Sequence, residues 1–372
     1  MYSSFPQKGS SVLVLTNSLG GLFSFRKEVV KVLIDKGFCV TIAGPPLNNF
    51  KSDYFKEIGC SIKVINIDRR GTNPFRDFVL FFQYLKLMKK LNPFVVLTYT
   101  IKPNVYGGMV ARYFNIPQLA NITGLGTAIE NPGMLKKFAT FLYRFGLKKA
   151  NMVFCQNSLI LEYCRQHHIG KDRLLIPGSG VNLDWHTYKD YPFQNTTIKM
   201  NYFGRVMKEK GVEEFFEMAK RLRLKYPQTE FHIFGRCEDP YEDRLKKLQG
   251  EGVIIWHGPV SDVRPHIKDT WCTIHPAYHE GMSNVLLESC AAGRPVIASD
   301  INGCKEAIDD GVNGYLCKVK DTQDLTDKVE QFINLPYEQK VQMGLAARKK
   351  VEREFDRNLV TNAYLNEIKK IG

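Results

Sequence analysis

Glu280 and Glu288 are the residues of this sequence whose type and spacing best suit chemistry. Residues 272–276, just before them, predict a short buried strand, and residues 285–292 have the spacing of a helix. Glu280 is therefore expected on a strand-to-helix loop and Glu288 inside the helix. In open α/β sheets, ligands bind beyond the carboxyl ends of the strands, where the free N–H groups of a helix N-terminus suit a phosphate. We therefore expect Glu280 beside a bound nucleotide, with Glu288 deeper.

The ordinary alternative is a pair of solvated surface carboxylates. Glu288 argues against it, because Val285, Leu286 and Leu287 give this side chain an apolar setting that does not suit an unpaired charge.

Short apolar strands alternate with helical stretches along the whole chain, which is typical of doubly wound parallel sheets and predicts an α/β fold. A polar, irregular run at residues 177–197 interrupts the pattern and is the expected linker. The strands expected before it are residues 11–16, 39–43, 61–67, 94–99, 118–122, 152–155 and 174–176, and those after it are residues 198–203, 230–234, 253–256, 272–275, 295–298 and 315–319. Three helices are expected at the end of the chain.

Several motifs resemble the retaining glycosyltransferases of family 4. Glu-x7-Glu is followed by Ala-Ala-Gly-Arg-Pro-Val-Ile-Ala-Ser-Asp at residues 291–300, and Gly204-Arg205-Val206 precedes Lys210-Gly211 at the spacing of a family signature. Ser18-Leu19-Gly20-Gly21 is similar to the glycine loop of the family, and residues 303–314 to its closing block. Each match alone is weak, but their common order and spacing over the whole chain are specific.

The resemblance implies a GT-B fold, in which two doubly wound Rossmann-like domains face a central cleft and the donor is a nucleotide sugar. Residues 1–180 would form the acceptor and membrane-facing domain, and residues 190–356 the nucleotide-sugar-binding domain. A last helix within residues 357–372 would cross back to the first domain.

The resemblance also assigns roles to residues. Loss of a nucleoside diphosphate from a sugar develops negative charge on the phosphates and positive charge on the ring, so cations and oriented N–H groups are needed. The catalytic set implied is Glu280 at the sugar with Arg205 and Lys210 at the diphosphate. The nucleotide-sugar-binding set implied is Gly20, Gly21, Arg205, Lys210, Gly281, Met282, Ser283, Asn284 and Glu288, with Glu288 on the ribose.

The mechanism stays open between covalent attack by Glu280 and a front-side displacement that needs no dedicated base. His275 and His279 are candidate bases, with strand-end packing as the alternative for each. No Asp-x-Asp motif occurs in the sequence. We therefore expect a metal-independent reaction without a cofactor, in which the UDP-sugar is a substrate.

The acceptor side departs from the family pattern, because no histidine occurs before His167. The corresponding segments, residues 99–104 and 122–127, make Lys102, Asn104, Thr123 and Gly124 the candidate acceptor residues.

These two segments, Asn73-Pro74 and the pattern within residues 300–308 resemble bacterial enzymes that add an N-acetylhexosamine to a sugar on undecaprenyl diphosphate. Such enzymes build capsule, O-antigen or protein-linked glycans at the cytoplasmic face of the membrane. The resemblance implies a UDP-sugar donor and a polyprenyl-diphosphate-linked sugar acceptor; the sugars and the linkage stay open.

Positive charge is confined to one half of the chain. Of a net charge of +14, residues 1–190 hold 25 Lys and Arg against 11 Asp and Glu, whereas residues 191–372 hold 27 of each. No nucleic-acid-binding motif accompanies the charge, so we expect an anionic membrane surface as partner rather than nucleic acid. Residues 75–91 and 134–149 combine aromatic and basic residues at helical spacing, as in helices that lie in a headgroup layer. An ordinary core-facing helix is the alternative, equally favoured for the first segment and less so for the second.

The composition agrees with this setting. A length of 372 residues with 44% hydrophobic content suits two domains. Nine single cysteines without a C-x-x-C pair favour a reducing compartment and no structural zinc. No signal peptide or membrane span is expected, which predicts a soluble or surface-attached protein. The resemblance then implies a peripheral position at the cytoplasmic face of the bacterial inner membrane.

Two other classes of protein remain as alternatives. A sugar-nucleotide 2-epimerase shares the GT-B architecture, but the Glu280/Glu288 pair argues against it. A basic nucleic-acid-binding protein would explain only the positive charge. It would give no role to the Arg205/Lys210 and Glu280/Glu288 pairs.

Overall fold

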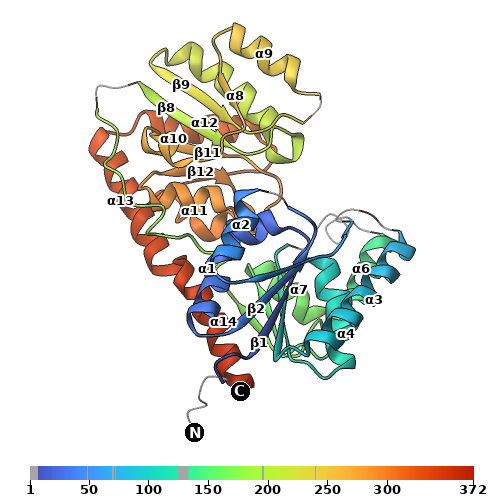
Figure 1. Ribbon diagram of the computed structural model, residues 1–372. Helices are drawn as coiled ribbons and strands as arrows, with labels where there is room; N and C mark the ends of the chain where they lie inside the picture. Colours follow the sequence, from blue (N-terminus) through green and yellow to red (C-terminus); the bar gives the residue numbers. More distant parts are fainter. Residues whose placement is uncertain are drawn as a thin grey trace. The chain divides into compact units, whose positions relative to one another are not determined.

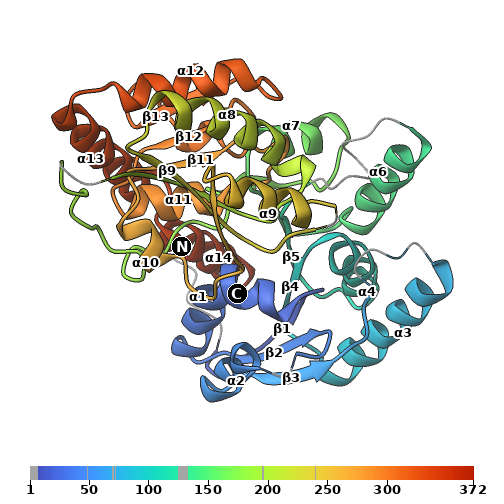
Figure 2. The ribbon, with the colours of Figure 1, turned by 90° about the horizontal axis from the view of Figure 1, so that it is seen from above.

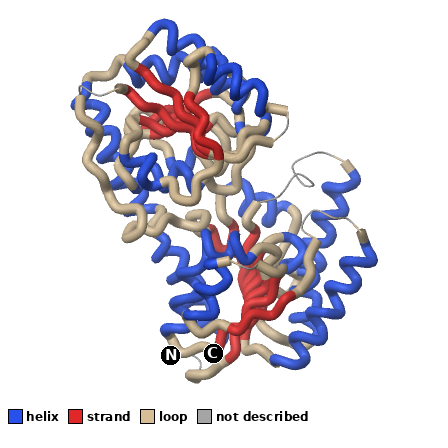
Figure 3. Tube along the Cα trace, turned by 45° about the horizontal axis from the view of Figure 1, so that its top comes forward, coloured by secondary structure: helices blue, strands red, loops and turns tan. Residues whose placement is uncertain are grey.

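The computed structural model describes residues 7–47, 49–68, 71, 73–124, 133–194, 197–238 and 240–372. The chain divides into two compact units: unit 1 comprises Met1–Ser179 with Arg357–Gly372, and unit 2 comprises Gly180–Asp356. In each unit a parallel sheet lies between helices, as the red strands and blue helices of Figure 3 show. The expected loop at residues 125–127 lies outside the described residues.

Unit 1 contains a seven-stranded sheet in the order β3-β2-β1-β4-β5-β6-β7, and all of its strand pairs are parallel. The strand order reverses between β1 and β4, which is the topological switch point where ligands bind in such sheets. Its strands are β1 (Ser11–Leu15), β2 (Cys39–Gly44), β3 (Ser61–Val64), β4 (Val95–Tyr99), β5 (Gln118–Ile122), β6 (Met152–Cys155) and β7 (Arg173–Leu175).

The helices of unit 1 are α1 (Leu19–Asp35), α2 (Phe50–Glu57), α3 (Pro74–Leu91), the π-helix η1 (Pro103–Gly107), α4 (Gly108–Tyr113), α6 (Met134–Gly146), α7 (Ser158–Gln166) and α14 (Arg357–Ile371). Four of them, α1, α2, α3 and α7, begin at a side chain that caps them. Ser18, Asn49, Asn73 and Asn157 each accept a hydrogen bond from a backbone N–H of the first turn that follows. Helices α3, α4 and α6 stand along one side of the unit (Figures 1 and 2).

Helix α14, at the end of the chain, belongs to the core of unit 1. Val360, Tyr364, Leu365 and Ile368 pack among the strand residues of the sheet. The Tyr364 hydroxyl accepts a hydrogen bond from Asn121 Nδ2 at 2.9 Å, within a buried polar network described below.

Unit 2 contains a six-stranded parallel sheet in the order β10-β9-β8-β11-β12-β13, with its switch point between β8 and β11. Its strands are β8 (Ile198–Phe203), β9 (Thr229–Phe234), β10 (Ile255–Gly258), β11 (Cys272–His275), β12 (Val296–Ser299) and β13 (Gly314–Cys317). Its helices are η2 (Lys208–Lys210), α8 (Val212–Lys225), α9 (Glu242–Gly250), α10 (Arg264–Lys268), α11 (Asn284–Ala291), η3 (Lys305–Ala307), α12 (Thr322–Ile333) and α13 (Tyr337–Glu354).

The α/β fold class with two doubly wound sheets is confirmed, and a strand lies in every segment where one was expected. The prediction was wrong about the length of one strand: β3 ends at Val64, where residues 61–67 were expected. Pairing stops there because Pro45 and Pro46 follow the partner strand β2 and have no N–H to donate. Among the described residues, no helix is both long and apolar enough to cross a membrane.

Candidate functional site at the switch point of unit 2

Two loops meet at the carboxyl ends of β8 and β11, on either side of the switch point. Gly211 ends the loop after β8 with a φ of 70°, and a Cβ atom at this position would lie 1.8 Å from the carbonyl oxygen of Pro276. Only glycine permits this approach and this backbone conformation. The glycine therefore brings Lys210 against the loop that carries Glu280.

Lys210, Glu280 and His275 form a compact cluster. Lys210 Nζ lies 2.5 Å from Glu280 Oε1, and His275 Nε2 lies 2.8 Å from the same oxygen. The Lys210 and Glu280 side chains are 19% and 17% exposed, and His275 is buried. Burial raises the pKa of Glu280, but the hydrogen bonds and charges of His275 and Lys210 outweigh it and lower the pKa to about 2. Glu280 is therefore a carboxylate at neutral pH, held between two nitrogen donors.

The backbone around Glu280 is fixed by a second glycine contact. Gly303 has a φ of 91°, and a Cβ atom there would lie 2.7 Å from the Glu280 carbonyl oxygen. Ser283 N donates to Gly303 O at 2.8 Å, and Gly303 N donates to Glu306 Oε2 at 2.6 Å. These contacts hold Gly281 and the start of α11 in place.

The N-terminus of α11 presents polar atoms that have no partner in the described part of the chain. Ser283 is the N-cap residue, but its side chain makes no capping hydrogen bond. Ser283 Oγ and Asn284 Oδ1 are both buried and without a partner. Buried polar atoms are normally satisfied, so this end of the helix suits a polar or anionic ligand. Met282 packs its side chain in a hydrophobic cluster, which leaves only its backbone for such a ligand.

Glu288 and Arg205, the other side chains of unit 2 predicted to bind the donor, pair with residues outside this cluster. Glu288 lies inside α11, as expected, with His186 Nε2 3.9 Å from its Oε1. Arg205 Nη1 pairs with Glu238 Oε1 at 2.8 Å, and the two side chains are 45% and 40% exposed. An exposed pair of this kind is weak, so an anionic ligand can compete for Arg205.

Sequence reasoning missed His186 and Glu238, and it valued His275 only as a possible base. His186 and Glu238 are far in sequence from their partners, so no local spacing could reveal them. The signal for His275 was its place at the end of the strand before Glu280. His279, the other candidate base, is exposed.

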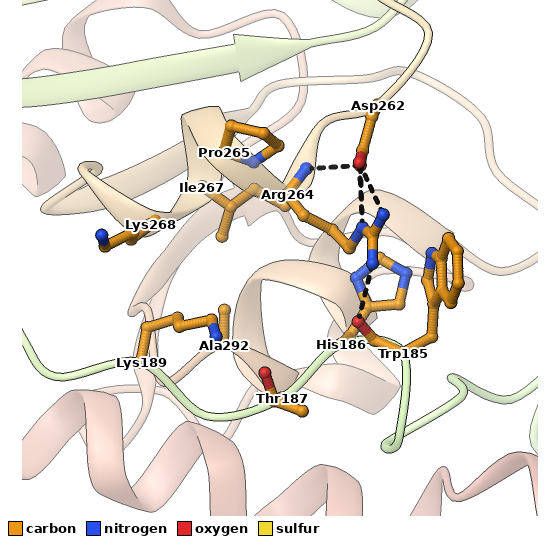
Figure 4. Close-up of a pocket in the computed structure, with 10 residues that line it drawn as sticks. All are labelled: Trp185, His186, Thr187, Lys189, Asp262, Arg264, Pro265, Ile267, Lys268 and Ala292. Atoms are coloured by element: carbon orange, nitrogen blue, oxygen red, sulfur yellow. Dashed lines mark hydrogen bonds and ion pairs between the residues drawn. The ribbon is translucent and has the colours of Figure 1, made fainter.

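His186 also lines a pocket of about 250 Å³ within unit 2 (Figure 4). The Arg264 guanidinium lies 3.8 Å from the centroid of the Trp185 ring and pairs with Asp262 at 2.6 Å. Lys189 and Lys268 complete a lining in which cations outnumber carboxylates. His186 therefore lies between Glu288 and a pocket whose charged side chains are mostly cationic.

The predicted residues of unit 1 fall into two groups. Gly20 and Gly21 form the first turn of α1, where Gly21 N donates to Ser18 Oγ at 3.0 Å and a Cβ atom on Gly20 would meet nothing closer than 4.0 Å. This leaves room for a ligand at the switch point of the sheet. Thr123 and Gly124 follow β5 and are partly exposed.

Lys102 and Asn104 are engaged inside unit 1. Lys102 Nζ pairs with Asp77 Oδ1 at 2.6 Å, and Tyr106 donates to the other oxygen of Asp77 at 2.9 Å. Asn104 is fully buried, accepting a hydrogen bond from Thr98 at 2.7 Å and donating to Asn121 O at 2.9 Å. The network continues through Gln118, Gln156 and Tyr364. In this structure both side chains serve the packing of unit 1.

Both halves of the chain match glycosyltransferase families. Residues 185–350 match the model described as glycosyl transferases group 1, and residues 13–157 match the model described as glycosyl transferase 4-like. Together with two doubly wound units, these matches show that the chain belongs to the glycosyltransferases of GT-B fold, as the sequence resemblance predicted.

The relatives are bacterial. The chain is 26% identical to N,N'-diacetylbacillosaminyl-diphospho-undecaprenol alpha-1,3-N-acetylgalactosaminyltransferase of Campylobacter jejuni, over 94% of this chain and 96% of that protein. It is 24% identical to the capsular polysaccharide biosynthesis glycosyltransferase CapM of Staphylococcus aureus, over 77% of this chain and 80% of CapM. Among solved structures, a glycosyltransferase from Rickettsia africae matches with a TM-score of 0.80 at 19% identity, covering 98% of this chain and 99% of that one. HepE of Anabaena in complex with UDP and glucose matches with a TM-score of 0.78 at 16% identity, covering 97% and 100%.

Proposed function

We propose that this glycosyltransferase moves an N-acetylhexosamine from a UDP-sugar to a sugar carried on undecaprenyl diphosphate, with retention of the anomeric configuration. The observation that carries the proposal is the Lys210–Glu280–His275 cluster at the switch point of unit 2. The near full-length similarity to the Campylobacter enzyme supports the acceptor class. The product would enter capsule, O-antigen or another glycan assembled at the cytoplasmic face of the bacterial inner membrane.

The reaction assigns a task to each group of the cluster. A diphosphate that binds at the start of α11 attracts Lys210, because it carries more negative charge than the Glu280 carboxylate. Glu280, still held by His275, then faces the sugar ring as the ring becomes cationic. Arg205 leaves its exposed pair with Glu238 to bind the phosphates, and Glu288 binds the ribose. These cations do the work of a metal, so we propose a metal-independent reaction that needs no cofactor.

UDP is the donor nucleotide that the resemblance implies. HepE shares the fold and was solved with UDP and glucose, which makes UDP-sugars the first donors to test. The family match favours transfer over the 2-epimerase and nucleic-acid alternatives.

A membrane partner is supported by two exposed apolar rows in unit 1. On α6, Met134, Leu135, Phe138, Phe141 and Phe145 are all exposed, whereas the core face holds Ala139, Tyr143 and Gly146. The core-facing alternative is therefore wrong for these phenylalanines. On α3, the exposed row is Phe75, Phe78, Val79 and Phe82.

Basic residues accompany both rows. Residues 74–149 hold 11 Lys and Arg against two Asp and Glu. Aromatic side chains beside lysines suit the boundary between headgroups and acyl chains, and the charge suits anionic lipid. We therefore propose peripheral attachment to an anionic membrane through α3 and α6.

The test is mass spectrometry of lipid-linked products after the protein is offered a panel of UDP-sugars and prenyl-diphosphate-linked acceptors. Transfer gives a product heavier by one sugar and releases UDP only when acceptor is present. Release of UDP with a free epimerised sugar and no dependence on acceptor would favour the epimerase. Salt-sensitive DNA binding without either activity would favour the nucleic-acid alternative.

A further inference from the structure

A cavity of about 640 Å³ in unit 1 is lined by residues other than those considered so far for the acceptor. Its walls come from three segments: Pro45 and Pro46 after β2, Asn66 to Asp68 after β3, and the first turns of α3 as far as Gln83. All three begin or end at the carboxyl edge of the sheet, where parallel sheets bind ligands. The volume lies within the range typical of small-molecule sites.

We propose that this cavity binds the sugar of the lipid-linked acceptor. The inference rests on the proposed function, which requires a place for a neutral saccharide whose lipid stays in the membrane.

The polar lining suits hydroxyl and amide groups. Asn66, Asp68, Asp77 and Gln83 supply carboxylate and amide oxygens and amide N–H donors. Gln83 Oε1 is buried and has no partner among the described residues. A buried acceptor in this state is rare in folded proteins, and a sugar hydroxyl that donates to it would satisfy it.

The charges of the described lining favour a neutral ligand. Asp77 is held by Lys102 at 2.6 Å and by Tyr106 at 2.9 Å, and Asp68 is paired with Arg76 at 2.9 Å. Among the described residues, each of these cations is thus matched to a carboxylate, which suits a saccharide better than an anion. Lys102, predicted to lie at the acceptor, acts in this site by fixing Asp77 in the wall.

The cavity shares two lining residues with the row of α3 proposed to meet the membrane. Phe75 and Val79 line the cavity and are 82% and 56% exposed. A lipid-linked saccharide could therefore leave its prenyl chain among the acyl chains beside these residues while its sugar enters the cavity. Pro46 and Ile67 offer apolar surface for the C–H face of a sugar ring.

The experiment measures Gln83→Leu, which removes the unpartnered oxygen with little change of volume. The acceptor probe is the geranyl-diphosphate-linked N-acetylhexosamine that gives product in the panel above. We expect the KM for this acceptor to rise about tenfold, as for the loss of one buried hydrogen bond. The KM for the UDP-sugar, and the affinity for the UDP-sugar in the absence of acceptor, should not change. Gln166→Leu, the same substitution at an exposed position of α7, is the matched control.

Ile67→Trp, which fills the cavity instead of emptying it, provides the test if Gln83→Leu does not fold. Unchanged acceptor KM in a folded variant would overturn the site.

Binding is also followed without turnover, by saturation-transfer NMR with methyl glycosides of N-acetylglucosamine and N-acetylgalactosamine. A signal in the wild type that Ile67→Trp abolishes supports the cavity as a saccharide site. If no transfer occurs in that case, only the proposed reaction is rejected. A signal that survives in Ile67→Trp overturns the cavity.

Discussion

The negative charge of Glu280 is balanced in this structure by Lys210, the residue proposed to bind the donor diphosphate. Lys210 and His275 share one of its oxygens, so the carboxylate is strongly ionised but not free. The charge of Glu280 acts on the ring only when the diphosphate has drawn Lys210 away. Binding of the donor would thus prepare the carboxylate for its own reaction.

Replacing Glu280 with Ala should lower turnover by at least ~10²-fold, because its charge matters most when the ring becomes cationic. UDP affinity should stay the same or rise, since Lys210 loses a competing partner. Product formation and calorimetry with UDP check the two parts. Glu251→Ala, at an exposed position of the same unit, is the control. Near wild-type turnover in folded Glu280→Ala would remove this residue from the chemistry.

Lys210→Ala and Arg205→Ala should each cost about 2–4 kcal/mol of transition-state stabilisation, read from kcat/KM. Both cations face the charge that develops on the leaving diphosphate. Activity should persist in EDTA. Loss of activity on chelation that Mg²⁺ or Mn²⁺ restores would show that a metal takes part.

Glu280 should also make stability depend on pH in the acid range. Its pKa is lowered to about 2 in the folded state from the ordinary value of 4.5 for a glutamate side chain. The stability gained from the carboxylate is therefore fully present above about pH 4.5 and lost as the pH falls towards 2, on the order of 3 kcal/mol. Urea unfolding between pH 7 and pH 2.5 should show the free energies of the wild type and Glu280→Gln converging as the pH falls. A constant difference over this range would contradict the lowered pKa.

At the scale of elements, α6 presents the clearest prediction. Phe141 and Phe145 lie stacked with centroids 6.1 Å apart on its exposed face. Replacing Phe138, Phe141 and Phe145 with Ser should weaken binding to liposomes of acidic lipid, because less apolar surface enters the headgroup layer. Changing Lys136, Lys137, Lys148 and Lys149 to Gln should mainly lower the salt sensitivity of binding, since each contributes roughly 1 kcal/mol through a screened field.

Liposome flotation at several salt concentrations measures both effects, and circular dichroism checks the fold. If both folded variants float as the wild type does, α6 is not the anchor. The same experiment would then be made on α3.

The elements themselves could be predicted well from the sequence, and the site only in part. The predicted bounds of β5, β6, β8 and β11 agree with the structure, because residues that favour turns or helix starts mark the ends of each segment. The extra length expected for β3 shows the limit, since its end is set by prolines after a neighbouring strand.

Spacing within one segment placed Glu280 on its loop and Glu288 in its helix. Spacing could not show that Lys210 binds Glu280 or that Arg205 binds Glu238, because these contacts depend on how distant loops meet. It could not show that Asn104 is buried in a network that ends in α14.

For the whole molecule, α14 decides the stability of unit 1. Tyr364 is fully buried, packs on Phe154 with centroids 4.3 Å apart, and accepts the hydrogen bond from Asn121. Tyr364→Ala should lower the free energy of unfolding by about 3–5 kcal/mol, since it leaves a cavity and an unpaired amide. Urea denaturation measures the loss, and Tyr113→Ala, at an exposed position of the same unit, should cost little. A small effect of Tyr364→Ala would show that α14 is dispensable for this core.

The place of α14 in the core of unit 1 also sets the order of events during synthesis. Residues 180–356 separate the first part of unit 1 from its last helix, so the ribosome must translate all of unit 2 before unit 1 can close. At elongation rates of about 5–20 residues per second this delay lasts roughly 10–35 s. During that time the nascent amino-terminal half exposes the groove that Val360, Tyr364 and Ile368 later fill, in addition to the aromatic rows of α3 and α6. Among the described residues, the amino-terminal half exposes more large apolar side chains than the rest of the chain, and it stays incomplete until α14 is made. We therefore expect a chaperone that binds nascent chains to act mainly on this half.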